Sequence, residues 1–261
     1  MDIRGGVTIV TGSATGVGAA AVKMLAAKGC NVVINYTKSE AEAKETQAAC
    51  EALGVQALLC QADVGKDEDC RRMVAAAMAK WGRVDGLINN AGTTKFVNHA
   101  NLDGLDADDF LNIYRVNVVG AFQMTRAVTP YMKAAAGGAV VNISSVAGVM
   151  GVGSSIAYTA SKGALNTMTL SLARVLGPEI RVNTVCPGFI QGRWLRGGMG
   201  DDMYEAAVAA QERSTPLRHA GTPEDMAEAA VWFIEGASNV TGEILIVDAG
   251  SHLGAAPLIA R

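Results

Sequence analysis

Short apolar runs alternate regularly with longer helical stretches, and this alternation most constrains what the chain can fold into. The predicted strands are residues 7–10, 31–36, 55–61, 84–88, 139–143, 180–185 and 244–247. Most are rich in β-branched residues, which is typical of parallel strands buried on both faces, and the helices between them supply the crossover connections. No repeat, low-complexity linker or domain boundary interrupts the pattern. We therefore expect one α/β domain over residues 1–261, with a parallel sheet covered by helices on both faces.

A glycine-rich turn follows the first strand and leads into an alanine-rich helix. A strand, a glycine-rich turn and a helix N-terminus together form a cradle for phosphate. By analogy with the related fingerprint, Gly12 permits the tight turn, Gly16 lets the backbone approach a pyrophosphate, and Gly18 allows close helix–strand packing. The expected cofactor contacts here are Gly12, Ser13, Thr15, Gly16, Val17 and Gly18. Glycines are common in loops, so the turn alone is a weak signal.

The end of the second strand bears on the choice between NADP and NAD. NAD-selective sites place an acidic residue there to bond the ribose hydroxyls. This chain has Tyr36, Thr37 and Lys38, and no carboxylate before Glu40. The missing acid and the lysine favour NADP(H), with NAD(H) as the alternative if Lys38 is only a solvated residue at a helix start. Ser39 begins a capping-box pattern and has a structural explanation of its own.

Ser145 and the sequence Tyr158-Thr159-Ala160-Ser161-Lys162 suggest acid–base chemistry. A helix would place Tyr158 and Lys162 on one face, one turn apart. A nearby lysine cation favours the phenolate, so we expect the pKa of Tyr158 to fall and the phenol to exchange a proton with an alcohol or alkoxide. Ser145 ends a predicted strand and could share the same oxygen atom. The alternative is an ordinary helix, because Tyr-x-x-x-Lys is a common sequence.

Another candidate is Asn117, which lies among valines in a helix predicted over about residues 106–135. A buried amide needs partners, so it is either a structural pin or part of a site. Residues 189–221 form a long, glycine-containing segment after a strand, with a short helix expected over 203–211. Such a segment is where a substrate lid would lie.

Composition excludes several other classes of protein. The net charge is −3 with both signs mixed, which gives no nucleic-acid or membrane-surface footprint. The number of cysteines is odd and there is no Cys-x-x-Cys, so we expect free thiols, no disulfide framework and no metal site. No apolar stretch approaches the length of a membrane span, and residues 1–6 lack the shape of a signal peptide. We expect a cytoplasmic protein.

Taken together, these stretches resemble the short-chain dehydrogenase/reductase family. The matches occur in order along nearly the whole chain: Thr11-Gly12-xxx-Gly16-x-Gly18, Asp63, Asn89-Asn90-Ala91-Gly92, Asn117, Ser145, Tyr158-xxx-Lys162 and Pro187-Gly188. The resemblance implies a seven-stranded Rossmann sheet in the order 3-2-1-4-5-6-7. It also implies a homotetramer or homodimer packed through the helices that bear Asn117 and Tyr158.

The resemblance also implies a role for each matching residue. Tyr158 would be the general acid/base, and Lys162 would bind the nicotinamide ribose and lower the pKa of the phenol. Ser145, rather than Ser144, would hydrogen-bond the substrate oxygen, and Asn117 would hold a water in the proton relay. The remaining expected cofactor contacts are Asp63 and Val64 by the adenine, Asn89, Ala91 and Gly92 along the cleft, and Pro187, Gly188 and Ile190 by the nicotinamide.

Three departures from the family pattern are visible. Thr15 and Thr37 stand where NADP-preferring members often have arginine or lysine, so the NADP preference rests on Lys38 and the missing acid. A threonine common after Pro-Gly is replaced within residues 189–193, where Gln191 or the backbone could substitute. Asp248-Ala249-Gly250 stands where Asp/Asn-Gly-Gly is usual.

The function most favoured is NADP(H)-dependent interconversion of a ketone and a secondary alcohol. A 3-oxoacyl-carrier-protein reductase is one alternative, weakened because only Lys133 is basic in the stretch before the fifth strand, although Arg193, Arg196 and Arg213 could bind an acidic carrier. A sugar, polyol or steroid dehydrogenase is another. Outside this family, a nucleotide sensor without turnover is disfavoured by the intact catalytic set, and a methyltransferase by the missing acid and by Tyr158 and Lys162.

Overall fold

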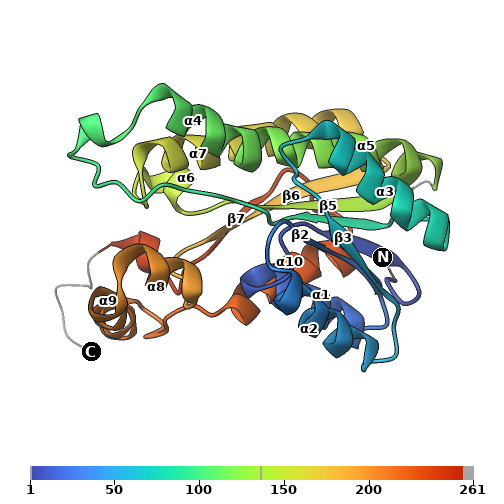
Figure 1. Ribbon diagram of the computed structural model, residues 1–261, viewed down its shortest axis with the longest axis horizontal. Helices are drawn as coiled ribbons and strands as arrows, with labels where there is room; N and C mark the ends of the chain where they lie inside the picture. The colour runs from blue at the N-terminus through green and yellow to red at the C-terminus, as the bar shows by residue number, and fades with distance from the viewer. Residues whose placement is uncertain (1, 136, 255–261) are drawn as a thin grey trace.

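A computed structural model describes residues 2–135 and 137–254. Met1, Ala136 and residues 255–261, which the expected domain includes, lie outside the described residues. Seven parallel strands form one sheet in the order β3-β2-β1-β4-β5-β6-β7, which confirms the predicted architecture (Figure 1). The strands are β1 (Val7–Val10), β2 (Asn31–Tyr36), β3 (Ala57–Gln61), β4 (Gly86–Asn89), β5 (Gly138–Ile143), β6 (Ile180–Pro187) and β7 (Ile244–Val247).

Strand β1 lies at the point where the strand order reverses. Thr8 pairs with Val32 of β2 on one side and with Gly86 of β4 on the other. The connections that leave β1 and β4 therefore run to opposite faces of the sheet, and a crevice opens beyond the carboxyl ends of these strands. The glycine-rich turn follows β1 at that edge.

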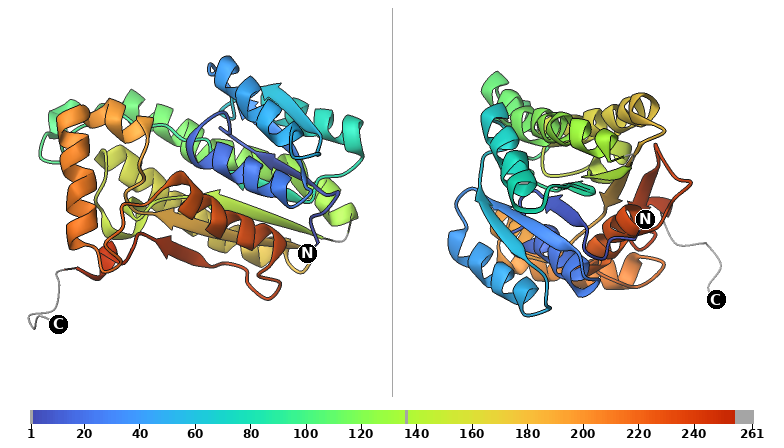
Figure 2. Two further views of the ribbon diagram at one scale, coloured as in Figure 1. Left: turned by 90° about the horizontal axis from the view of Figure 1, so that it is seen from below. Right: turned by 90° about the vertical axis from the view of Figure 1, so that its right-hand side faces the viewer.

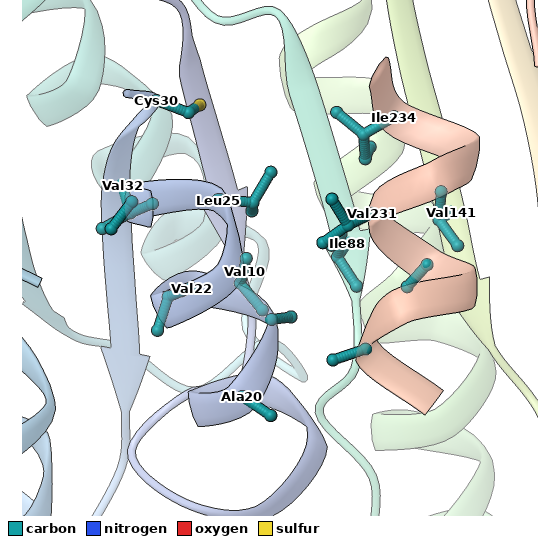
Figure 3. Packing of buried hydrophobic residues seen from close by; sticks show 14 of the residues in the cluster. Val10, Ala20, Val22, Leu25, Cys30, Val32, Ile88, Val141, Val231 and Ile234 are labelled. Atoms are coloured by element: carbon teal, nitrogen blue, oxygen red, sulfur yellow. The ribbon is translucent and has the colours of Figure 1, made fainter. Parts of the chain in front are cut away.

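Alternate residues along each strand point to the two helical layers. On one face, Val10, Val32, Ile88 and Val141 pack against α1 (Gly16–Ala27) and α10 (Pro223–Glu235), with α2 (Glu40–Glu51) on the same side (Figures 1 and 3). The opposite core includes Ile9, Val33, Leu87, Val140 and Val182. The helices over it are α3 (Asp67–Trp81), α4 (Ala107–Tyr114), α5 (Ala121–Ala134) and α7 (Ile156–Leu176).

The long helix expected over about residues 106–135 is interrupted. A π-helical turn, η2 (Arg115–Gly120), separates α4 from α5. Its last residue, Gly120, packs so tightly that an added Cβ would lie 2.7 Å from a methyl carbon of Val64. The wider turn contains Asn117, and π-helical turns often occur at functional sites.

Residues 189–221 contain two helices, α8 (Arg193–Met199) and α9 (Asp201–Ser214), so the helix predicted over 203–211 is longer than expected. They lie at one end of the molecule, away from the N-terminus (Figures 1 and 2). The two ends of the segment meet in a β-bridge between Ile190 and Gly221. Three short helices complete the described chain: η1 (Leu102–Gly104), α6 (Ala147–Met150) and η3 (Ser251–Leu253).

All five cysteines are free thiols. Within the described ranges, no helix is both long enough and apolar enough to cross a bilayer.

Candidate functional site

The glycine-rich turn is held by two asparagines to which the sequence analysis assigned no role. The Gly12 N–H donates to Asn35 Oδ1 at 2.9 Å, and the Asn35 N–H donates to Ser13 Oγ at 3.0 Å. On the other side, Asn90 Nδ2 donates to the carbonyl oxygens of Thr11 and Gly12, both at 2.9 Å. Asn35 lies one residue before the end of β2, and Asn90 directly follows β4. The strands on both sides of β1 therefore fix the shape of the turn that follows it.

The glycines of this turn suit a cradle for the pyrophosphate of a dinucleotide. Gly12 and Gly16 have φ angles of +61° and +58°, which side-chain-bearing residues rarely adopt. A Cβ on Gly18 would lie 2.7 Å from the Gly12 carbonyl oxygen, so this position needs the absence of a side chain. A Cβ on Gly16 would meet nothing within 4 Å, which leaves its backbone open to a ligand. The residues present fit a nicotinamide dinucleotide.

Asp63 lies at the side of the crevice where the adenine is expected. Its carboxylate accepts hydrogen bonds from Arg115 Nη1 and from the Gly65 N–H, both at 2.9 Å. Burial alone would raise its pKa, but these hydrogen bonds hold the pKa below the usual value. A hollow of about 300 Å³ adjoins it, lined by Thr37, Gln61, Ala62, Asp63, Asp69 and Arg72. Asp63 and Thr37 of the predicted cofactor contacts therefore share one hollow.

Tyr36 and Lys38 lie at the end of β2 or just beyond it. The Lys38 side chain is exposed, and it has no side-chain partner among the described residues. Val64 is buried, and its carbonyl oxygen accepts a hydrogen bond from Gln123 Nε2 at 2.7 Å. These positions border the expected nucleotide site, and their contacts with a cofactor stay predictions.

Tyr158 and Lys162 lie one turn apart on α7, as the spacing predicts. The Ser155 side chain caps this helix by accepting from the Tyr158 N–H at 3.2 Å. Lys162 Nζ is 5.6 Å from the centroid of the Tyr158 ring and donates to the Ile143 carbonyl oxygen at 2.8 Å. The phenol and the ammonium thus share the carboxyl edge of β5.

The structure brings Ser145 rather than Ser144 to the phenol. The Ser145 hydroxyl lies close enough to the Tyr158 hydroxyl to lower its pKa. Ser145 Oγ also accepts from the Ala147 N–H at 3.1 Å, which fixes its direction. The Ser144 side chain is buried and donates to the Lys162 carbonyl oxygen at 3.1 Å. Two hydroxyl groups therefore converge on one point, where the oxygen of a ligand can join them.

One sequence-based expectation is wrong in this structure, because Lys162 does not lower the pKa of Tyr158. Burial raises the pKa of Tyr158 to about 12, with the Ser145 hydroxyl acting in the opposite direction. Burial also lowers the pKa of Lys162 to about 8. The ammonium is directed at Ile143 rather than at the phenol oxygen, and burial weakens its own hold on the proton.

Asn117 clamps the segment that follows β4. Its Oδ1 accepts from the Thr93 N–H at 2.8 Å, and its Nδ2 donates to the Thr93 carbonyl oxygen and to Ser161 Oγ, both at 3.0 Å. It is therefore a structural pin. It also borders the site, because a Cβ placed on Gly92 would be 3.5 Å from Asn117 Oδ1 and 3.8 Å from Lys162 Nζ.

The Asn89 side chain turns into the core. Its Nδ2 donates to Asn142 Oδ1 at 2.9 Å and to Thr125 Oγ1 at 3.2 Å, and the residue is only 4% exposed. Ala91 contacts the glycine-rich turn, since its N–H donates to Thr11 Oγ1 at 3.0 Å. Asn89 thus stiffens the interior, while its sequence neighbours face the crevice.

Pro187 and Gly188 close the crevice on the β6 side. The Pro187 carbonyl oxygen accepts from the Val146 N–H at 2.9 Å, which ties the end of β6 to the turn after Ser145. A Cβ on Gly188 would lie 2.5 Å from Asp248 Cβ, so the close approach to the end of β7 requires glycine. Ile190 continues this strand into the bridge with Gly221.

Two residues of α8 reach the site, and sequence reasoning missed both as site residues. The Trp194 ring lies 6.4 Å from the Tyr158 ring in an edge-on arrangement, and it is 3.6 Å from the position of a Cβ on Gly92. The Arg193 guanidinium contacts Thr15 and Ser39. Neither lies in a motif, and only their membership of the predicted lid could have suggested them. Over residues 2–135 and 137–254, no group of three His, Cys, Asp or Glu side chains is placed to hold a metal ion.

Comparison with known proteins gives the family. A family model described as enoyl-(acyl carrier protein) reductase matches residues 12–252. A protein assigned as ketoacyl reductase 2 of the granaticin polyketide synthase of Streptomyces violaceoruber is 39% identical over 247 residues, covering 95% of this chain and 96% of the relative. A crystal structure from Burkholderia xenovorans shows a protein assigned as a short-chain dehydrogenase/reductase. It is 40% identical to this chain, with a TM-score of 0.89, and the match covers 95% of this chain and 98% of the other. A structure of NAD+-bound xylitol dehydrogenase is 27% identical, with a TM-score of 0.85 over 95% and 99% of the two chains.

Proposed function

The chain belongs to the short-chain dehydrogenase/reductase family of NAD(P)-binding oxidoreductases, and from that premise we propose that it interconverts a ketone and a secondary alcohol with NADP(H), using Tyr158 as the general acid and base. The observation that carries the proposal is the placement of the Ser145 hydroxyl next to the Tyr158 phenol, with Lys162 beside the same ring. This pair lies at the edge of the sheet that also carries the glycine-rich cradle.

The nicotinamide, when bound, supplies the hydride to the carbonyl carbon or accepts it in the reverse direction. The protein's own task is to stabilise the oxygen on which charge develops and to give it a proton. Ser145 Oγ holds that oxygen in line with Tyr158, and the Tyr158 hydroxyl donates the proton. In the oxidative direction, the same phenol oxygen takes the proton from the alcohol.

Lys162 makes this proton transfer feasible. With a pKa of about 8, most of the lysine is charged at neutral pH. When Tyr158 gives up its proton, the ammonium 5.6 Å from its ring stabilises the phenolate, although it does not acidify the resting phenol. Lys162 also borders the space beside Gly92, where it would bind the nicotinamide ribose. Asn117, which is hydrogen-bonded to Thr93 and Ser161, would position the segment beside Gly92 and a water in the proton relay.

The preference for NADP(H) over NAD(H) is supported by the end of β2. No carboxylate lies between Tyr36 and Ser39, and Lys38 is exposed there with its charge unneutralised among the described residues. A dianionic 2′-phosphate would be attracted to such a site, whereas the ribose hydroxyls of NAD would lack an acidic partner. The NAD+-bound xylitol dehydrogenase among the structural neighbours keeps NAD(H) as the alternative.

A free small molecule fits as substrate better than a ketone carried on an acidic carrier protein. Two of the three lid arginines that could bind such a carrier are already paired: Arg193 with Glu42, and Arg196 with both Asp201 and Glu205. The names of the relatives point to ketoacyl groups and to polyols, so a 3-oxoacyl-carrier-protein substrate and a sugar, polyol or steroid are the alternatives.

The remaining proposals concern the assembly of the enzyme. Residues 189–221 act as the substrate lid of a single domain, because α8 brings Trp194 to the phenol. Val119, Phe122 and Leu170 are exposed apolar residues of η2, α5 and α7. We propose that this face packs against a second copy in a homotetramer or homodimer. The free thiols and the mixed charge support the proposal of a cytoplasmic location with no nucleic-acid or membrane partner.

Replacing Tyr158 by phenylalanine tests the proposed chemistry. The variant keeps the ring but loses the proton, so kcat for an activated ketone with NADPH should fall by about 10²–10⁴-fold, the size of a general acid's contribution. NADPH binding should persist, and Tyr131→Phe, at an exposed position of α5, is the matched control. Equal turnover of Tyr158→Phe and the parent would refute the assignment. NADPH binding without turnover of any ketone by the parent would instead indicate a sensor.

A further inference from the structure

Arg193 crosses from the lid to the nucleotide side of the crevice. Its Nη2 donates to Thr15 Oγ1 at 3.1 Å and to Ser39 Oγ at 3.2 Å, and its Nη1 is 2.7 Å from Glu42 Oε1. These three partners belong to the glycine-rich turn and to the start of α2. They are more than 150 residues away in sequence.

The guanidinium lies where the ribose end of the cofactor is selected. The ribose 2′ group binds between the turn after the first strand and the end of the second, and there a carboxylate favours NAD and an arginine favours NADP. Thr15 and Ser39 border this place from either side. Both are N-cap residues whose hydroxyls do not cap their own helices, so these hydroxyls are available to a ligand.

The lid thus brings a cation to a place where the local sequence has none. Thr15 and Thr37 are neutral, and the exposed Lys38 is the nearest basic residue in sequence. A guanidinium can form two parallel hydrogen bonds with a phosphate, which makes it a stronger and more selective ligand than an ammonium. The contact between Arg193 and Thr15 places a guanidinium at the entrance of the expected ribose site.

We propose that Arg193 recognises the 2′-phosphate of NADP(H) and that this contact holds the lid in place over the cofactor, an inference that rests on the NADP(H) preference proposed above. Glu42 is the anion that pairs with the guanidinium in the structure, where a bound phosphate would compete with it. The hydrogen bond from Arg193 lowers the pKa of Glu42, so the carboxylate is ionised at neutral pH. A bound 2′-phosphate then displaces Glu42, because the two anions compete for one cation.

The same helix connects the ribose to the reacting end of the site. Trp194 follows Arg193 directly, and its ring lies 6.4 Å from that of Tyr158. When the phosphate holds Arg193, the first turn of α8 holds Trp194 against the phenol and covers the space beside Gly92. The 2′-phosphate therefore contributes to closure at the substrate pocket, although it takes no part in the chemistry.

The test compares equilibrium dissociation constants for NADPH and NADH, measured by calorimetry, in the parent and in three variants. Loss of a charge-assisted bidentate contact in Arg193→Gln should weaken NADPH binding by about 10–100-fold. Binding of NADH, which lacks the phosphate, should change by less than about threefold, within the range of neutral surface changes. Arg193→Lys should recover only part of the loss, and Glu42→Gln should tighten NADPH by removing the competing anion.

Arg196→Gln is the matched control because it removes the same charge from the same helix. Arg196 pairs with Asp201 and Glu205 of α9, and its loss should leave the ratio of the two dissociation constants unchanged. Adenosine 2′,5′-bisphosphate and 5′-AMP repeat the comparison without the nicotinamide. If the parent prefers NADPH and Arg193→Gln keeps that preference, the role of Arg193 is refuted while the proposed function stands. If the parent binds NADH as tightly as NADPH, the proposed NADP(H) preference fails, and this inference fails with it.

Discussion

Replacing Lys162 by methionine should stabilise the folded protein at neutral pH while it abolishes activity. Lys162 is 4% exposed, and burial lowers its pKa from 10.5 to about 8. The difference of about 2.5 pH units, at about 1.36 kcal/mol per unit, corresponds to roughly 3 kcal/mol of unfolding free energy lost when the ammonium is buried at pH 7. Methionine keeps a similar length without the charge.

Part of this gain is offset. The Lys162 ammonium donates to the Ile143 carbonyl oxygen at 2.8 Å, and a buried acceptor that loses its partner costs about 1–3 kcal/mol. Taking the middle of that range, about 2 kcal/mol, we expect Lys162→Met to be about 1 kcal/mol more stable than the parent at pH 7, as the difference between these two effects.

The pH dependence identifies the cause of the gain. Below pH 8 the lysine is charged in both the folded and the unfolded chain, so the full burial cost is present. Between about pH 8 and 10.5 the unfolded chain holds the proton more tightly, so the stability of the parent rises with pH. The advantage of the variant should shrink over that window and should turn into a disadvantage above it, because a neutral Lys162 can still donate to Ile143 and methionine cannot.

Urea unfolding of the cofactor-free protein at pH 7, 8, 9 and 10 measures this difference. All samples need one protein concentration, because subunit association would shift apparent stability. Lys23→Met, at an exposed position of α1, is the control and should show no such pH-dependent gain. A variant advantage as large at pH 10 as at pH 7, or none at pH 7, would refute the reasoning that burial of this ammonium costs stability.

Two further predictions test the scaffold of the site. Gly18→Ala should lower the unfolding free energy, measured by urea unfolding, by about 1–3 kcal/mol and should weaken cofactor binding, because the new Cβ would lie 2.7 Å from backbone atoms. The control is Gly137→Ala, where a Cβ meets nothing within 4 Å; its unfolding free energy should stay within about 0.5 kcal/mol of the parent. Asn117→Ala should cost about 1–3 kcal/mol by leaving the Thr93 N–H and the Ser161 hydroxyl without this partner; calorimetric unfolding that matches the parent would show that water replaces the amide.

The sheet could be predicted because its strands are short apolar runs, most of them rich in β-branched residues, and because the site motifs follow those strands. The ends of β1, β4, β5 and β6 meet at one edge in any parallel sheet, so the convergence of Ser145 with the glycine-rich turn required no side-chain detail. The order of the strands and the residue roles came from the family resemblance rather than from residue patterns.

Contacts between distant segments could not be predicted. The π-helical turn around Asn117 depends on how Gly120 meets Val64, a contact between separate elements. The pKa of Tyr158 depends on burial, which outweighs the neighbouring charge that the spacing suggested. Arg193 reaches Thr15 only because the lid folds back over the crevice, and nothing in the local sequence encodes that path.

The bridge between Ile190 and Gly221 has a consequence for how such a protein can diversify. Gln191 adds a second tie, since its N–H donates to the Gly221 carbonyl oxygen at 2.8 Å and its Nε2 to the Ala220 carbonyl oxygen at 2.8 Å. Both ends of the segment between Ile190 and Gly221 are fixed at one point beside the sheet. Changes in the sequence or length of this segment therefore carry only a small entropic penalty. Residues 189–221 can thus differ between relatives while the positions of Ser145, Tyr158 and Lys162 stay unchanged.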